Sequence, residues 1–383
     1  MRSVVAFLAL SLALAVPVAT PALAADEEAR AQFERIIDEL NRNSFKAFLA
    51  AISRPAMLER IYAKRIIATP VRDAFERDFP NVVQSMYTES FPRSDTDITG
   101  TVVAFDVSGG NGRAVVRFSA GGYRYSYHVY ELAVAGDDRL AIVDWADYYA
   151  GSRFSEAVGN SLAMAMPGKP AVRQMITIVE LSEGQAFQVG ELFKAVRDRK
   201  TQRYFQIHDD LDEVLRKDPL IVHLTAQMAI VSKDRARYEQ AIEGIRSYLP
   251  TDPLQSLTLA TYDIGKKRFE DAIAELDRLG QALGVVDGVI ESFKASAAMA
   301  LGDFDRAESL ALQGTEAEPA LELTWWTLLR VRTAAGNYLG ALEPLARLED
   351  DFGQDLGPER LAKDRFLGVL SSQQAYIDWR ASR

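Results

Sequence analysis

Hydrophobic residues follow two different periods along this chain, and the change of period divides it into two halves. At the start, apolar positions between residues 25 and 51 recur at helical spacing and predict one amphipathic helix. The next helical stretch, residues 55–87, contains Pro70 and Pro80. Because proline lacks the backbone N–H and disfavours helix at the residue before it, two or three short helices are expected there.

Strict alternation of apolar and polar residues replaces the helical period between residues 98 and 148. The intervening turns are rich in Gly, Asn and Asp, which tolerate a positive φ. The pattern therefore predicts a four-stranded antiparallel meander, with strands at residues 101–107, 113–119, 123–134 and 140–145. Residues 152–166 return to a helical pattern, which ends at Met166-Pro167-Gly168.

The order of these elements, helices first and a curved meander after them, resembles the cystatin-like cone fold of the nuclear-transport-factor-two-like superfamily. The resemblance covers residues 25–165 and depends on element order, without a sequence motif. Members of that superfamily include small-molecule pocket enzymes and also accessory or dimerisation domains. The resemblance therefore implies a fold and does not choose a function.

The second half is helical and repeats itself at a period near 34 residues. Each repeat carries an aromatic residue followed three positions later by alanine, at Tyr238/Ala241, Phe269/Ala272, Phe304/Ala307 and Tyr338/Ala341. Gly302-Asp303-Phe304 and Gly336-Asn337-Tyr338 add a small residue at the turn, and Trp325, Pro253 and Pro319 stand at further recurring positions. This pattern resembles the tetratricopeptide repeat, which implies stacked antiparallel helix pairs.

The predicted fold is thus an α+β N-terminal domain, with helices packed on a four-stranded antiparallel meander, followed by an all-α tetratricopeptide solenoid. The expected divisions are a signal peptide at 1–24, the α+β domain at 25–166, a linker at 167–187, the repeats at 188–352 and a C-terminal capping helix at 353–383.

The first residues have the features of an export signal. Arg2 precedes an apolar run over residues 4–16, and Ala22-Leu23-Ala24 is a small-x-small cleavage site. The run is shorter than the roughly 20 residues that cross a bilayer, and no later stretch is long and apolar enough to do so. The mature chain is expected in the periplasm, or alternatively in the medium.

Composition removes several classes of function. Lys and Arg number 44 against 54 Asp and Glu, for a net charge of -10, which argues against nucleic-acid binding. The chain has no cysteine and three histidines, which excludes disulfides and thiolate metal sites. We expect no cofactor, no metal and no catalytic residues.

The resemblance to tetratricopeptide repeats implies that the first helices of the pairs line a concave groove for a protein or peptide partner. Trp326 and Arg330, one helical turn apart, are the expected anchor. The groove positions carried over from the family are His223, Leu257, Thr261, Ser292, Ser296, Met299, Trp326, Arg330 and Thr333.

An alternative remains open in the meander, where His128 and Tyr130 share one strand face and Asp144 lies on the last strand. A His128 base oriented by Asp144 within an aromatic cavity would make a small-molecule or enzymatic pocket, with the repeats as a docking arm. The main prediction is a non-enzymatic adaptor that binds protein partners in the cell envelope and can form a homodimer through its N-terminal domain.

Overall fold

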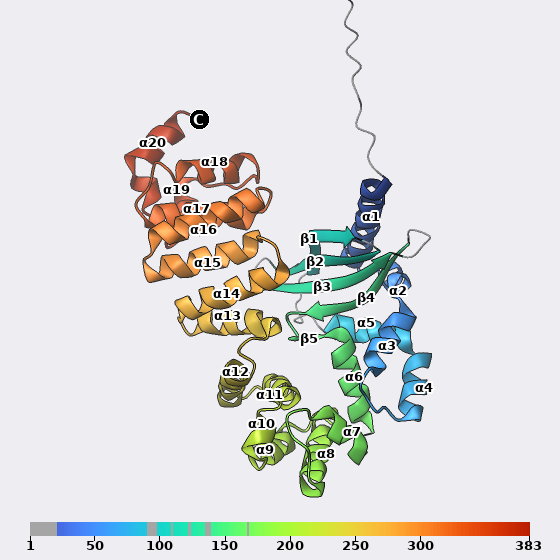
Figure 1. Ribbon diagram of the computed structural model, residues 1–383. Helices are drawn as coiled ribbons and strands as arrows, with labels where there is room; N and C mark the ends of the chain where they lie inside the picture. Colours follow the sequence, from blue (N-terminus) through green and yellow to red (C-terminus); the bar gives the residue numbers. More distant parts are fainter. Residues whose placement is uncertain (1–20, 90–97, 109, 122–123, 135–138, 167) are drawn as a thin grey trace, which may run out of the picture.

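The computed structural model describes residues 21–89, 98–108, 110–121, 124–134, 139–166 and 168–383 (Figure 1). Most of the predicted signal peptide, residues 1–20, lies outside the described residues. The helices that precede the sheet are α1 (Pro21–Asn41), α2 (Lys46–Ala51), α3 (Arg54–Tyr62), α4 (Thr69–Arg77) and α5 (Phe79–Glu89).

The prediction of a single opening helix over residues 25–51 is wrong, because two helices, α1 and α2, occupy this range. Asn43 adopts a left-handed conformation with φ 59°, which ends α1 and redirects the chain into α2. The three short helices that follow confirm the expected breaks. Proline stands in the first turn of α3 and of α4, where its missing N–H costs no hydrogen bond, so these prolines begin helices.

The sheet is an antiparallel meander in which strands follow one another in chain order. Its described part has five strands where four were expected, because a two-residue strand pairs with the end of β4. The strands are β1 (Ile98–Ser108), β2 (Asn111–Ala120), β3 (Arg124–Val134), β4 (Leu140–Asp147) and β5 (Ser152–Arg153).

One face of the sheet packs against the helices of the N-terminal half. Phe33 of α1, Phe48 of α2 and Tyr87 of α5 meet Tyr130 and Trp145 of the sheet in one buried aromatic cluster. Edge-to-face contacts dominate this cluster, as is favourable for aromatic rings, whose faces are negative and whose edges are positive.

The rest of the chain is helical. Its elements are α6 (Phe154–Ala165), α7 (Lys169–Met175), α8 (Glu183–Arg197), α9 (Thr201–Asp209), α10 (Glu213–Arg216), α11 (Pro219–Ser232), α12 (Arg235–Tyr248), η1 (Pro253–Gln255), α13 (Ser256–Gly265), α14 (Phe269–Leu283), α15 (Gly288–Leu301), α16 (Phe304–Ala317), α17 (Glu322–Ala334), α18 (Leu342–Asp350), α19 (Pro358–Leu361), η2 (Leu370–Ser372) and α20 (Gln374–Ala381).

These helices stack as pairs that follow the predicted period. The first helices of the pairs are α8, α11, α13, α15 and α17, and their partners are α9, α12, α14, α16 and α18. The expected linker contains α7 and the start of α8, and the expected single capping helix is instead divided into α19, η2 and α20. The chain thus has an N-terminal helical region, an antiparallel sheet and a C-terminal half of repeated helix pairs.

The middle helices of the C-terminal half, α13–α15, lie beside the sheet (Figure 1) and pack against its second face. Tyr127, Val129 and Tyr148 on this face pack against Leu257 of α13 and Leu279 of α14 in a shared buried cluster. Both faces of the sheet therefore carry buried residues, one against helices of the N-terminal half and the other against α13–α15.

Candidate functional site

The concave groove predicted on the first helices is partly filled by the protein's own sheet. Leu257 is 8% exposed and packs against the sheet, and Ser292 is 1% exposed with its hydroxyl donating to the Gly288 carbonyl at 2.7 Å. Thr333 is also buried, and its hydroxyl donates to Leu329 at 2.8 Å. These three predicted groove positions are not on an open surface, which corrects the sequence-based expectation.

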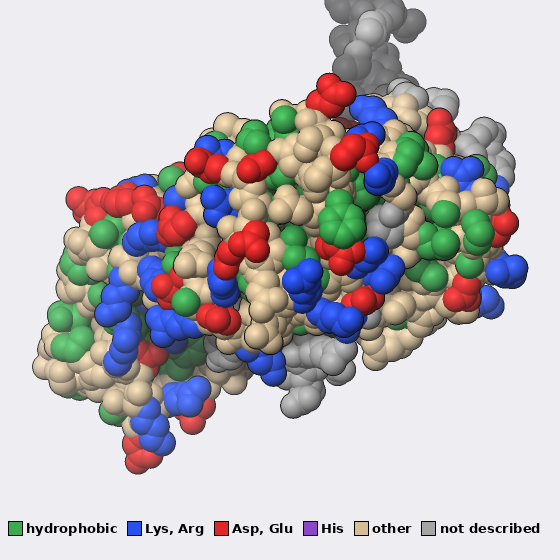
Figure 2. Space-filling model, turned by 90° about the horizontal axis from the view of Figure 1, so that it is seen from below, with side chains coloured by type: hydrophobic (Ala, Val, Ile, Leu, Met, Phe, Trp, Pro, Cys, Tyr) green, Lys and Arg blue, Asp and Glu red, His purple; other side chains and the backbone are tan. Residues whose placement is uncertain are grey.

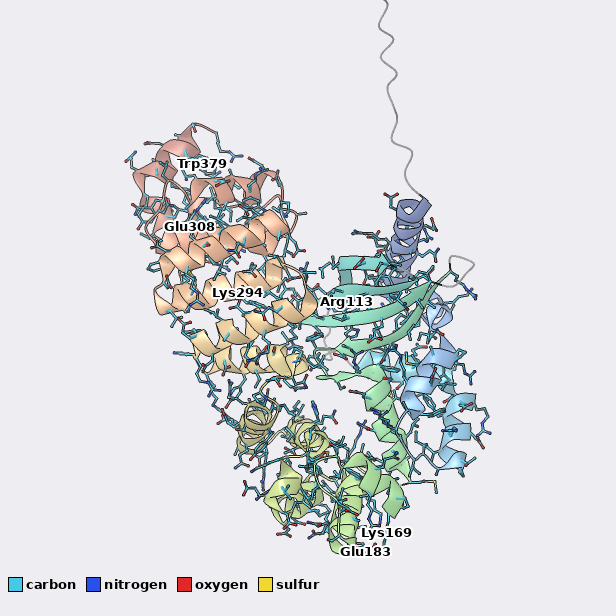
Figure 3. All side chains as sticks on the ribbon, viewed as in Figure 1. Arg113, Lys169, Glu183, Lys294, Glu308 and Trp379 are labelled. Carbon is cyan, nitrogen blue, oxygen red and sulfur yellow. The ribbon has the colours of Figure 1, made fainter. Side chains whose placement is uncertain are left out.

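The contact between sheet and repeats includes a helix end capped by an arginine. Arg113 of β2 donates to the carbonyl oxygens of Ala282 at 2.8 Å and of Leu283 at 2.7 Å, at the end of α14. A cation is favourable there because the last carbonyls of a helix carry partial negative charge. Figure 3 labels Arg113 at the boundary between the sheet and the repeats.

A buried charged network joins the same two parts. Arg117 of β2, 5% exposed, donates to Asp287 at 2.7 Å and to Glu318 at 2.6 and 3.0 Å. Tyr127 of β3 donates to Asp287 at 2.7 Å, and Asp287 also caps the first turn of α15. Burial alone would lower the pKa of Arg117, but the hydrogen bonds that Arg117 donates to Glu318 and the negative charge of Asp287 raise this pKa above its ordinary value.

This covered face also bears on the expected homodimer. A dimer formed through the second face of the sheet would need the surface that the repeats already occupy. Self-association through that face therefore has no support in this arrangement.

Other predicted groove residues lie on the C-terminal halves of the first helices, which the sheet does not cover. Thr261 of α13 and Ser296 of α15 are exposed, and Met299 is half-buried. The two hydroxyls donate to carbonyls of their own helices at 2.8 Å. These positions form the open part of the groove.

The predicted anchor has partners within the chain. The guanidinium carbon of Arg330 lies 5.5 Å from the centre of the Trp326 ring, and Arg330 Nη2 lies 3.0 Å from Asp364 Oδ2 in the C-terminal segment. Trp326 Nε1 donates to Glu322 at 2.8 Å. Both side chains are half-buried, so the pair helps to hold the C-terminal segment and presents a reduced surface to a partner.

His223 lies at a junction between the repeats and the N-terminal half. Its Nε2 is 3.9 Å from Asp252 Oδ2, before η1. Burial lowers the pKa of His223, which outweighs the opposing attraction of Asp252 and of Glu156 on α6. His223 is therefore a junction residue, and its neutral form is favoured.

The alternative pocket has a different arrangement from the one expected. The strand register places His128 opposite Asp147, whose Oδ2 lies 3.5 Å from Nε2, while His128 Nδ1 lies 3.2 Å from the Tyr130 hydroxyl. Asp144 instead accepts hydrogen bonds from the backbone and hydroxyl of Ser155 at 3.1 and 2.7 Å, at the start of α6. Asp144 therefore does not orient His128.

This histidine cluster lacks room for a substrate in the part of the domain that the structure describes. His128 is 0% exposed, and the hydroxyls of Tyr87 and Tyr130 lie 2.9 Å apart beside it. The neighbouring cavity, lined by Phe118 and Ser126 among others, has a volume of about 10 Å³. Such a volume holds about one water molecule.

A feature that the sequence reasoning did not identify recurs at the turns between paired helices. Residues with positive φ stand there at intervals of 34 or 35 residues: Arg199, Lys233, Lys267, Gly302 and Gly336. The predicted repeat frame places glycine at the last two of these turns and makes no assignment at the first three. The signal that could have found the site is that cations occupy the same position of the frame where glycine is missing.

The described residues show charges of both signs on the face seen in Figure 2 and no cluster that suits a metal ion. Figure 2 shows acidic and basic side chains intermixed over the face seen from below. Among the described residues there is no cluster of three or more histidine and carboxylate side chains suited to a metal ion. No helix in the described ranges has the length and apolar character needed to span a bilayer.

Comparison with known proteins does not assign this chain to a family. No protein-family model matches the sequence, and no curated protein matches it. Among solved structures, the crystal structure of MamA protein aligns with 46% of this chain and 100% of its own at 16% identity and a TM-score of 0.31. That TM-score is too low to establish a shared fold, so the description of the repeats rests on the helices of this chain.

Proposed function

We propose that this protein is an exported, non-enzymatic adaptor whose helical repeats, of tetratricopeptide type, bind a partner protein in the cell envelope. The observation that carries the proposal is the stack of helix pairs with open C-terminal halves on its first helices. Such stacks present extended surfaces that suit a peptide or a partner helix. The aromatic-filled interior of the N-terminal domain fits a structural role better than a reaction chamber.

The sheet has a part in this function as a support for the repeats. It occupies the N-terminal halves of α13 and α15, which leaves the partner the remaining surface around Thr261 and Ser296. The leader-like first 24 residues support export to the periplasm, with secretion to the medium as the alternative. Mass spectrometry of the protein from a fractionated envelope would test cleavage after Ala24.

Affinity capture tests the adaptor proposal. The chain from residue 25 is the bait, beside a Thr261→Arg/Ser296→Arg variant that blocks the open groove with bulk and charge. The control is Gln84→Arg on the exposed surface of α5. We expect a specific partner that the wild type and the control retain and the groove variant loses. No specific capture by the wild type, or equal capture by the groove variant, would contradict the proposal.

A further inference from the structure

The turns after α11 and α13 carry lysine in a backbone conformation that favours glycine. Lys233 has φ 57° and Lys267 has φ 60°, whereas Gly302 and Gly336 occupy the equivalent turns after α15 and α17. A residue with a Cβ is unfavourable in the left-handed region, and glycine is not. The two lysines therefore stand where glycine would be the better choice for folding alone.

These lysines differ from their neighbours in their charge environment. Lys233 and Lys267 are exposed and, within the described part of the chain, form no ion pair. The surrounding cations have carboxylate partners in the fold: Arg235 with Glu239 at 2.9 Å, Lys266 with Glu239 at 2.6 Å and Arg268 with Glu243 at 3.2 Å. The positive charge that remains for a partner is thus concentrated on the two lysines.

The same ion pairs show that the two turns are neighbours. Glu239, near the start of α12, contacts both Arg235 and Lys266, so the turn after α11 and the turn after α13 lie side by side. An apolar residue precedes each lysine by three positions: Ile230 is 62% exposed and Ile264 is 36% exposed. Two cations and two exposed isoleucines therefore form one surface, which we name the lysine–isoleucine surface.

We propose that the lysine–isoleucine surface binds an extended, acidic segment of a partner protein, with its carboxylates on Lys233 and Lys267 and its apolar side chains on Ile230 and Ile264. The inference rests on the proposed adaptor function and names the chemistry of the partner. Charge complementarity favours carboxylates, since opposite charges across an interface steer association. A polyphosphate chain is disfavoured, because it has no apolar groups to place on the exposed Ile230 and Ile264.

Binding of a defined probe tests this surface. The probe is a fluorescein-labelled peptide of alternating glutamate and valine, measured by anisotropy at low ionic strength. A peptide with lysine in place of glutamate and a single-stranded oligonucleotide are the comparison ligands. We expect Lys233→Gly/Lys267→Gly to weaken binding of the acidic peptide by about tenfold and to flatten its dependence on salt.

Two controls separate binding from folding. The double glycine variant relieves the unfavourable φ, so it should melt at the same temperature as the wild type or higher. Lys64→Gly/Lys46→Gln also removes two exposed lysines, one of them at φ 55°, but in the N-terminal half. This control should bind the acidic peptide within about twofold of the wild type.

Several outcomes would overturn the inference. The first is that the wild type does not bind the acidic peptide. The second is that Lys233→Gly/Lys267→Gly and Lys64→Gly/Lys46→Gln weaken binding of this peptide equally. The third is that the wild type binds the oligonucleotide or the lysine peptide more tightly than the acidic peptide. The capture experiment distinguishes failure of this inference from failure of the adaptor function. If the wild type captures a partner and Lys233→Gly/Lys267→Gly captures it equally, this surface is wrong and the adaptor proposal stands. If the wild type captures nothing specific, the adaptor proposal itself fails.

Discussion

Removal of Arg117 should uncouple the sheet from the repeats at a large and specific cost. Arg117 contributes the positive charge of a buried network in which it contacts Asp287 at 2.7 Å and Glu318 at 2.6 Å. In Arg117→Ala, the Asp287 side chain, which is 0% exposed, stays buried without its cation. Removal of one partner from a buried pair costs about 3–5 kcal/mol.

The structure places the expected value near the lower end of that range. Asp287 keeps the hydroxyl of Tyr127 at 2.7 Å and the backbone N–H groups of Val289 and Ile290 at 2.9 and 3.1 Å. These donors, together with the N-terminus of α15, still stabilise its negative charge. We therefore expect Arg117→Ala to lower the free energy of unfolding by about 3 kcal/mol.

Urea denaturation followed by tryptophan fluorescence measures this cost in both parts of the chain. Trp145 reports the N-terminal domain, and the tryptophans of the C-terminal half report the repeats. Arg306→Ala is the matched control, because its ion pair with Glu270 at 3.0 Å is exposed and should contribute less than about 1 kcal/mol. A loss for Arg117→Ala as small as that of the control would refute the reasoning that the network is desolvated.

A double-mutant cycle shows whether the cost belongs to the pair. If Arg117 and Asp287 interact directly, Arg117→Ala and Asp287→Asn together should cost less than the sum of the two single changes. The expected difference is about 1–3 kcal/mol, which is typical of residues in contact within one network. Additive costs would mean that each residue stabilises the protein independently of the other.

Three further predictions concern backbone conformation and protonation. Lys64→Gly should raise the free energy of unfolding by about 0.5–1 kcal/mol, because Lys64 has φ 55°; a loss in urea denaturation would contradict this. Gly302→Ala should lower it by about 1–2 kcal/mol, since Gly302 has φ 82°, and the same assay should show no such loss for an Ala substitution at Gly184, where no heavy atom lies within 4 Å of the added Cβ. The pKa of His223 is lowered in the folded state, so the unfolded chain binds the proton more readily and stability should fall as pH drops below about 6.5. His223→Gln should weaken that dependence in melting curves recorded from pH 7.5 to 5, and an unchanged slope would assign the effect to other groups.

Local patterns in the sequence located most of the helices and strands of the fold. Alternation and glycine-rich turns located β1–β4, and the positions of Pro70 and Pro80 located the starts of α4 and α5. The strand β5 was missed because two residues are too few to show a period. The break at Asn43 was missed because its left-handed conformation interrupts an otherwise continuous helical pattern.

Long-range packing was beyond those patterns, although one signal was present. Tyr125, Tyr127 and Val129 make the second face of β3 as apolar as the first. An antiparallel sheet with one face in water usually alternates apolar and polar residues, so apolar residues on both faces indicate that both are covered. The covering helices come from residues more than a hundred positions later, which no local period specifies.

The prediction that Asp144 orients His128 was wrong for a similar reason. The strand register that places Asp147 opposite His128 depends on an irregularity in pairing next to Glu131, which the sequence pattern does not reveal.

The position of the sheet in the groove changes what the repeats can offer to a partner. A family-based assignment treats each first helix as equivalent along its length, yet here the N-terminal halves of α13 and α15 are buried against the protein's own sheet. A partner must therefore contact the C-terminal halves and the turns that follow them. Those turns carry Lys233 and Lys267 in the two pairs that contain exposed isoleucines, and glycine at Gly302 and Gly336 further along. The surface proposed for recognition is therefore confined to α11–α14, because the equivalent turns after α15 and α17 carry glycine in place of a cation.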